Sequence, residues 1–132
     1  MDYTAEKHFV KTFIRKNRRE RLLYELTTPG KRYDGVSRFC HQSGSFINPA
    51  KILMQGEGMC LRPEFKDYVS RHDEMCFVLS PDYYMDERYM TLKDAVGQAL
   101  VCFDAVIIMG STFAVVFGED MKGGREQYLL SE

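Results

Sequence analysis

Apolar residues recur at helical spacing in two stretches of the second half of the chain. The first stretch begins at Pro63, and its apolar face follows an i, i+3, i+4, i+7 spacing: Phe65, Tyr68, Val69 and His72. The second begins at Thr91, which forms with Asp94 a capping box where Asp replaces the usual Glu. Its stripe is the most regular in the chain: Leu92, Ala95, Val96, Ala99, Leu100 and Phe103. Both stretches are predicted helices.

Continuous apolar runs predict strands between and after these helices. Residues 75–79, 105–109 and 112–117 are rich in β-branched and aromatic side chains. Gly110 and Ser111 separate the last two runs, and Gly at the first position of a two-residue loop is typical of a type II′ hairpin. Neither run alternates with polar residues, so we expect both faces of this hairpin to be covered.

Weaker patterns flank the hairpin. Residues 127–130 form a short apolar run that predicts a last strand at a sheet edge. Residues 82–90 combine tyrosines with charged residues and are predicted to form a loop, since Ser80 and Pro81 end the strand before them.

The N-terminal segment, residues 5–26, contains neither Gly nor Pro and favours helix, with Thr4 as the expected N-cap. Its early apolar face is not continued at helical spacing by the later apolar residues Leu22, Leu23, Tyr24 and Leu26. Residues 15–21 between them carry five cations. Either one helix changes packing partner midway, or a helix ends near Asn17 and a second helix or a strand follows.

Residues 31–58 give the poorest pattern in the chain. Asp34-Gly35 and Gly44-Ser45 resemble turns. Residues 51–54 fit either a helix that starts after Asn48-Pro49 or a short strand. The sequence leaves these alternatives open.

Taken together, the elements predict an α+β fold. We expect one domain over residues 1–132, with a basic helical segment at about 1–30 and a mixed core at about 31–132. The core is predicted to hold a sheet of about four or five strands, with a central antiparallel hairpin near the C-terminus. Three or four helices are expected to pack on this sheet.

Composition places the chain among globular proteins, because 45% of its 132 residues are hydrophobic and 28% are charged. No basic and apolar leader begins the sequence, and the longest apolar stretch is too short for a membrane helix. A cytoplasmic protein without a membrane partner is therefore expected. In that compartment the four cysteines are predicted to be free thiols.

Charge is distributed unevenly along the chain. Residues 1–40 hold ten Lys and Arg against five Asp and Glu, while residues 41–132 hold eight against fourteen. A basic cluster in the first part provides candidate phosphate contacts for nucleic acid: Lys11, Arg15, Lys16, Arg18, Arg19 and Arg21. The other interpretation is that this segment is solvated or packs on the acidic remainder of the fold.

Three chemical motifs are incomplete. Residues 118–125 follow a predicted strand with glycines at the spacing of a phosphate loop, but Gly124 and Arg125 stand where that motif requires Lys and Ser or Thr. The potential metal ligands lack a close pair: Cys40, His41, Cys60, His72 and Cys76. No local signature of a nucleophile surrounds Cys40 or Cys60. The sequence therefore predicts neither a cofactor nor a metal site, and it identifies no catalytic residue.

The residues 82–90 provide the best candidate for a protein interface. They contain side-chain types that are enriched at interface cores: Tyr83, Tyr84, Met85, Tyr89 and Met90. The alternative is that this segment folds back over the core. We therefore expect a non-enzymatic module that binds another protein or itself as a homodimer. Nucleic-acid binding through the basic cluster is the second hypothesis, and an enzyme of unidentified type is the third.

Overall fold

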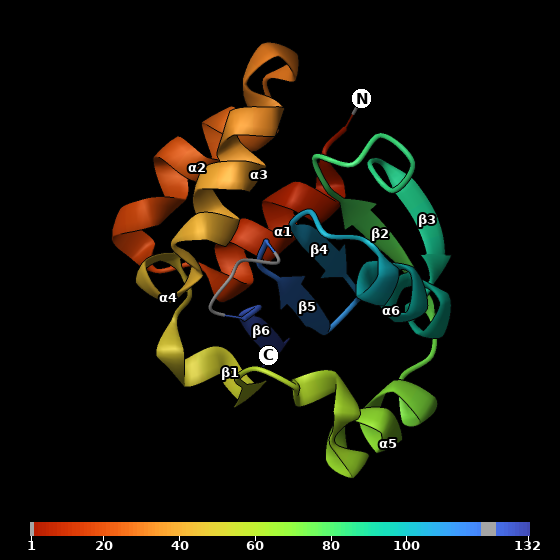
Figure 1. The fold of residues 1–132 in the computed structure, drawn as a ribbon. Coiled ribbons are helices and arrows are strands. Elements are labelled where there is room, and N and C mark those ends of the chain that lie inside the picture. Colours follow the sequence, from red (N-terminus) through yellow and green to blue (C-terminus); the bar gives the residue numbers. More distant parts are fainter. Residues whose placement is uncertain (1, 120–123) are drawn as a thin grey trace.

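A computed structural model describes residues 2–119 and 124–132. The chain folds into an α+β domain in which one antiparallel sheet lies between two layers of helices (Figure 1). The six strands have the order β1-β6-β5-β4-β2-β3. Each face of the sheet has its own hydrophobic core, because the strand residues alternate between the two helical layers.

The N-terminal half of the chain forms the first helical layer. Its elements are α1 (Thr4–Phe13), η1 (Lys16–Arg18), α2 (Arg19–Leu26), η2 (Pro29–Lys31), α3 (Arg32–His41), α4 (Ser43–Phe46) and η3 (Pro49–Lys51). The aromatic rings of Phe9, Phe39 and Phe46 pack edge to face within this layer. They lie over strand residues such as Ile107 and Val116.

The second helical layer covers the opposite face of the sheet. It consists of η4 (Met59–Leu61), α5 (Pro63–Arg71) and α6 (Leu92–Val101). Thr91 caps α6 by accepting a hydrogen bond from the Asp94 amide, as the capping box predicts. The buried stripe of α6 ends at Ala99, whereas Leu100 and Phe103 are exposed.

The sheet is built around β4 (Val106–Met109) and β5 (Phe113–Phe117), whose residues are all buried. The remaining strands are β1 (Ile52–Gln55), β2 (Met75–Leu79), β3 (Arg88–Thr91) and β6 (Gln127–Ser131). The predicted central hairpin is thereby confirmed, and the sheet has one strand more than the upper expectation.

The turn of this hairpin is displaced by one residue from the prediction. Gly110 donates a hydrogen bond to the Phe113 carbonyl, so Ser111 and Thr112 form the two-residue loop. Gly110 does not have the positive φ of a type II′ turn. A Cβ at this position would lie 2.4 Å from the Phe113 ring, so glycine makes room for that ring.

Three more expectations change in the structure. The N-terminal segment follows the alternative with two helices, but the first helix ends at Phe13 instead of near Asn17, and Tyr3 rather than Thr4 occupies its N-cap. Residues 88–90, predicted as the end of a loop, form the edge strand β3 together with Thr91. The last strand, β6, lies between β1 and β5 and is not an edge, because residues 52–55 adopt the strand alternative and pair with it.

Asp34-Gly35 lies inside α3 instead of forming a turn. A Cβ at Gly35 would come within 2.8 Å of the Glu25 Cβ, so this glycine permits the close approach of α2 and α3. In the part of the chain that the structure describes, no helix combines the length and the apolar character needed to cross a bilayer.

Candidate functional site

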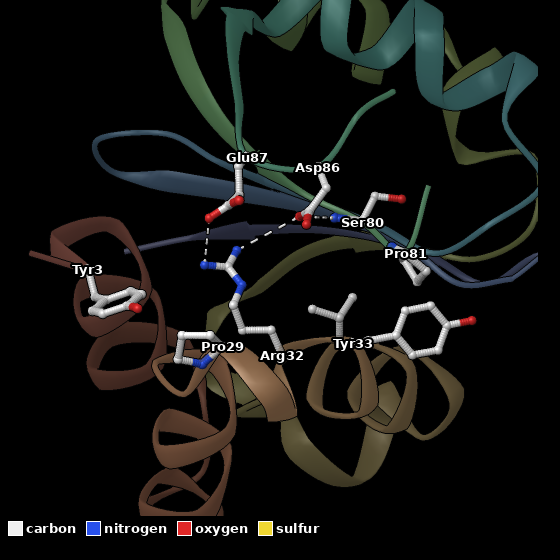
Figure 2. Close-up of a pocket in the computed structure, with 9 residues that line it drawn as sticks. Tyr3, Pro29, Arg32, Tyr33, Ser80, Pro81, Asp86 and Glu87 are labelled. Carbon is white, nitrogen blue, oxygen red and sulfur yellow. Dashed lines mark hydrogen bonds and ion pairs between the residues drawn. The ribbon is translucent and has the colours of Figure 1, made fainter. Parts of the chain in front are cut away.

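A groove runs along the seam where the first helical layer meets β2 and β3. One hollow of about 330 Å³ lies between α3 and the connection from β2 to β3. Figure 2 shows the Arg32 side chain rising between Tyr3 and Tyr33 toward Asp86 and Glu87. We call this hollow and its neighbour, described below, the seam groove.

Arg32 forms ion pairs with three carboxylates from different parts of the chain. Its terminal nitrogens lie 2.9 Å from Glu87 Oε1, 3.5 Å from Glu6 Oε2 and 3.8 Å from Asp86 Oδ1. Among the described residues, neither terminal nitrogen of Arg32 has a hydrogen bond of ordinary geometry, although both nitrogens are buried. The guanidinium therefore lies at the floor of the hollow and is incompletely satisfied.

The connection from β2 to β3 holds its carboxylates in place through its own hydrogen bonds. Asp86 Oδ1 accepts a hydrogen bond from the Ser80 amide, and the Glu87 amide donates to the Val78 carbonyl. Glu87 has a φ of 58°, which is uncommon for a residue other than glycine. Met85 is buried beneath the connection and anchors it to the core.

Burial shifts the pKa of two of these acids. Desolvation raises the pKa of Glu6 and that of Asp86, and the Arg32 charge opposes this rise in both. The Arg32 side chain is 11% exposed, whereas those of Asp86 and Glu87 are 34% and 43% exposed. Solvent therefore reaches the acidic walls of the hollow but hardly reaches the cation at its floor.

A second hollow of about 510 Å³ adjoins the first. Tyr3 and Glu87 line both hollows, so the two are neighbours along the seam. The remaining walls of the second hollow include Asp2, Glu6 and the aromatic residues Phe77 and Tyr89. The Phe77 and Tyr89 ring centroids lie 5.0 Å apart. The whole seam groove thus combines carboxylates with aromatic walls.

The residues predicted as a protein interface separate into two groups. Tyr83 and Tyr84 are 82% and 76% exposed, and Tyr89 is also exposed. Met85 is buried, and Met90 packs partly against the core. Met85 therefore packs into the core, as the alternative to a protein interface predicts, whereas the tyrosines are exposed to solvent.

A second segment with exposed apolar side chains adjoins the tyrosines. The Ser80 hydroxyl donates to the Ala105 carbonyl at 2.6 Å, and the Cys102 thiol contacts Asp82 Oδ2 at 3.4 Å. These contacts place the end of α6 beside the connection from β2 to β3. Exposed side chains of this second segment are Val101 and Phe103.

The predicted basic cluster lies at the junction of α1 and α2, and some of its side chains make contacts within the protein. Arg15 donates to the Ile47 and Gly44 carbonyls, and Arg19 donates to the Ile14 carbonyl. Arg18 lies over the Phe46 ring at 5.0 Å, and Arg21 pairs with Glu25. Lys11 and Lys16 are exposed and have no ion pair with another described residue.

Cys40, Cys60 and Cys76 are buried free thiols whose surroundings do not activate them. Burial raises the pKa of Cys60 and of Cys76 to about 12, and it also raises the pKa of Cys40. A raised pKa disfavours the thiolate that acts as a nucleophile. His72 stacks on Tyr68 and does not pair with a thiol.

Ligand atoms converge in one group of the described residues, formed by Asp82, Cys102 and Asp104. None of these was among the predicted metal ligands. The phosphate-loop candidate at 118–125 lies partly outside the described residues. Arg125, at its end, donates to the carbonyls of Gly118, Ala99 and Asp104, so this guanidinium fastens the β5–β6 connection to α6.

Sequence reasoning missed the seam groove because its residues are far apart in the chain. Arg32 lies just after the basic segment predicted at about 1–30, whereas Asp86 and Glu87 lie in the predicted loop 82–90. Comparison with known proteins adds no further assignment: no protein-family model, curated protein or solved structure matches this chain.

Proposed function

We propose that this protein is a protein-binding module that docks its partner along the seam groove and the adjoining tyrosines. The observation that carries the proposal is the gathering of exposed aromatic side chains around one connection of the sheet. Tyr33, Tyr83, Tyr84 and Tyr89 all lie on or beside the β2–β3 connection and are exposed. Tyrosine is enriched at interfaces because it buries a large area and still offers a hydroxyl.

The physical setting of these side chains supports binding more than catalysis. Hydrogen bonds and the buried side chain of Met85 fix the backbone of this connection, so the backbone that carries its tyrosines is ordered before a partner binds. A preformed surface loses less conformational entropy on association than a mobile one. The buried thiols, with their raised pKa values, offer no activated nucleophile.

Site-specific photo-crosslinking tests this proposal. A photoreactive phenylalanine analogue replaces Tyr84 in one variant and Tyr24 in a control, in cells that make the protein. Tyr24 is a suitable control because it is 58% exposed but lies on α2, away from the groove. We expect a discrete protein adduct from position 84 and none from position 24. Equal labelling at both positions, or none at either, would contradict the proposal.

Nucleic-acid binding is a second candidate, favoured by exposed Lys11 and Lys16 on the same corner as Arg18 and Arg21. Fluorescence anisotropy with a labelled single-stranded oligonucleotide tests it at low and physiological salt. Salt-sensitive binding that is lost in the double variant Lys11→Glu, Lys16→Glu would support this candidate. Unchanged binding in that variant would exclude the corner as the binding site.

A further inference from the structure

We propose that the seam groove recognises a basic segment of its partner, with one Lys or Arg side chain in each of its two hollows. This inference rests on the proposed protein-binding function and names the chemistry of the partner. It starts from charge: the lining residues include four carboxylates and one guanidinium. The carboxylates are Asp2, Glu6, Asp86 and Glu87.

Among the described lining residues, Arg32 is the one cation, and it does not neutralise the four carboxylates. Arg32 lies within 4.0 Å of three carboxylates, so two negative charges remain in that cluster when all three are ionised. Concave walls of low dielectric constant concentrate such a field, and this raises the local concentration of cations. An anionic or phosphorylated ligand would instead be repelled.

The walls suit an organic cation. Tyr3, Tyr33 and Tyr89 border the two hollows, and aromatic rings attract ammonium and guanidinium groups through their π faces. The Pro29 and Pro81 rings add apolar walls along which the alkyl part of a Lys or Arg side chain can pack. Both volumes lie in the range of small ligand pockets.

Two observations argue against a metal ion as the occupant. Among the described residues, the ligand atoms of the groove carboxylates do not come together closely enough to form a candidate metal cluster. The buried guanidinium of Arg32, with both terminal nitrogens lacking a hydrogen bond, also places a positive charge where the ion would sit. A peptide needs no converging set of ligand atoms, because its side-chain cations can pair with single carboxylates of the acidic walls.

The chain contains an acidic hollow that serves as an internal comparison. Its described lining residues include Glu57, Glu119 and Glu126 but no Phe, Tyr or Trp. If negative charge alone attracted a basic peptide, this hollow would compete with the seam groove. The inference therefore predicts that binding depends on seam-groove residues and not on Glu126.

Selection from a random peptide library displayed on phage tests the inference, with the purified full chain as bait. We expect the recovered peptides to be enriched in Lys and Arg. Synthetic peptides with the selected sequences should bind the Glu87→Gln and Tyr33→Ser variants roughly tenfold more weakly than the wild-type protein. Their affinity for the Glu126→Gln variant should change little. Tyr33 is 65% exposed, so Tyr33→Ser reports on binding even if Glu87→Gln disturbs the Arg32 cluster.

The outcomes separate the two proposals. Recovered peptides without cations that still lose affinity for Tyr33→Ser would overturn the basic-partner inference and leave protein binding intact. Peptides that bind Tyr33→Ser and Glu87→Gln as well as the wild type, or no recovered peptides, would overturn both. Basic peptides that lose affinity only for Glu126→Gln would place the site in the other acidic hollow and also overturn the inference.

Discussion

Arg32 contributes to the fold and also lies at the floor of the proposed binding groove. It joins α3 to Glu6 of α1 and to both acids of the β2–β3 connection. Removing one partner of a buried ionic cluster leaves its other charges uncompensated. Arg32 thus offsets part of the negative charge of the groove and links the elements that form it.

The Arg32→Met variant should lose about 3 kcal/mol of unfolding free energy at neutral pH. Without the guanidinium, the pKa values of Glu6 and Asp86, already raised by burial, would rise further. The native variant then binds more protons than its unfolded state, so its stability recovers as the pH falls toward about 5. Urea denaturation at the two pH values measures this change.

The control for this experiment is Arg71→Met. Arg71 pairs with Asp67 on the exposed surface of α5, and exposed pairs contribute about 0–1 kcal/mol. An Arg32→Met loss that is equally small, or one that does not shrink at the lower pH, would show that the cluster does not stabilise the native state as described.

Two glycines give opposite expectations because their surroundings differ. Gly97 lies within α6 with nothing within 4 Å of an added Cβ, so Gly97→Ala should stabilise the protein by about 1 kcal/mol. Gly35→Ala should destabilise it, because the new Cβ would lie 2.8 Å from the Glu25 Cβ and force α2 and α3 apart. Urea denaturation of both variants checks the pair, and a stabilising Gly35→Ala would refute the close approach.

At the scale of elements, the β4–β5 hairpin forms the centre of the hydrophobic core, because all residues of both strands are buried. Val106 and Val115 are fully buried in the core beneath α5 and α6. We expect Val106→Asp to unfold the domain, since an unpaired buried charge costs several kcal/mol. The matched substitution Leu53→Asp, at an exposed position of edge strand β1, should leave a folded protein.

Circular dichroism and thermal melting distinguish these two variants. A folded Val106→Asp with an unchanged melting temperature would mean that the hairpin does not form the centre of the core.

The elements that the sequence predicts best are those whose signals are local. Thr91 caps α6 and Pro63 begins α5, because caps and first-turn prolines act within a few residues. By contrast, Gly35 resembles a turn residue, yet it lies in α3 because of a contact with α2. β3 has only four residues, and its start depends on the positive φ of Glu87 and on pairing with β2.

The same difference explains why the seam groove could not be predicted. Tyr83, Tyr84 and Tyr89 carry a compositional signal, and the structure leaves them exposed. The contact between Arg32 and Glu87 joins residues far apart in the chain, and only the packing of α3 against the sheet brings them together. In the sequence these charged residues resemble any surface charges. They indicate a candidate site only when the structure shows them close together and partly buried.

At the scale of the whole molecule, the charge asymmetry of the sequence acquires a spatial meaning. Cations at the α1–α2 corner partly serve the fold through backbone carbonyls, as Arg15 and Arg19 do. The acids of the β2–β3 connection line the seam groove, between that connection and α3. The account therefore predicts that the partner docks on the acidic and aromatic surface around the β2–β3 connection.

The most direct test of this account is a nuclear magnetic resonance titration of the isotope-labelled full chain with a short oligo-arginine peptide. The same peptide with citrulline in place of arginine controls for charge. The account predicts that amide shifts change at Tyr3, Arg32, Asp86 and Glu87 with the arginine peptide and remain unchanged with the citrulline peptide. Equal shifts with both peptides, or shifts centred on Glu57 and Glu126, would contradict it.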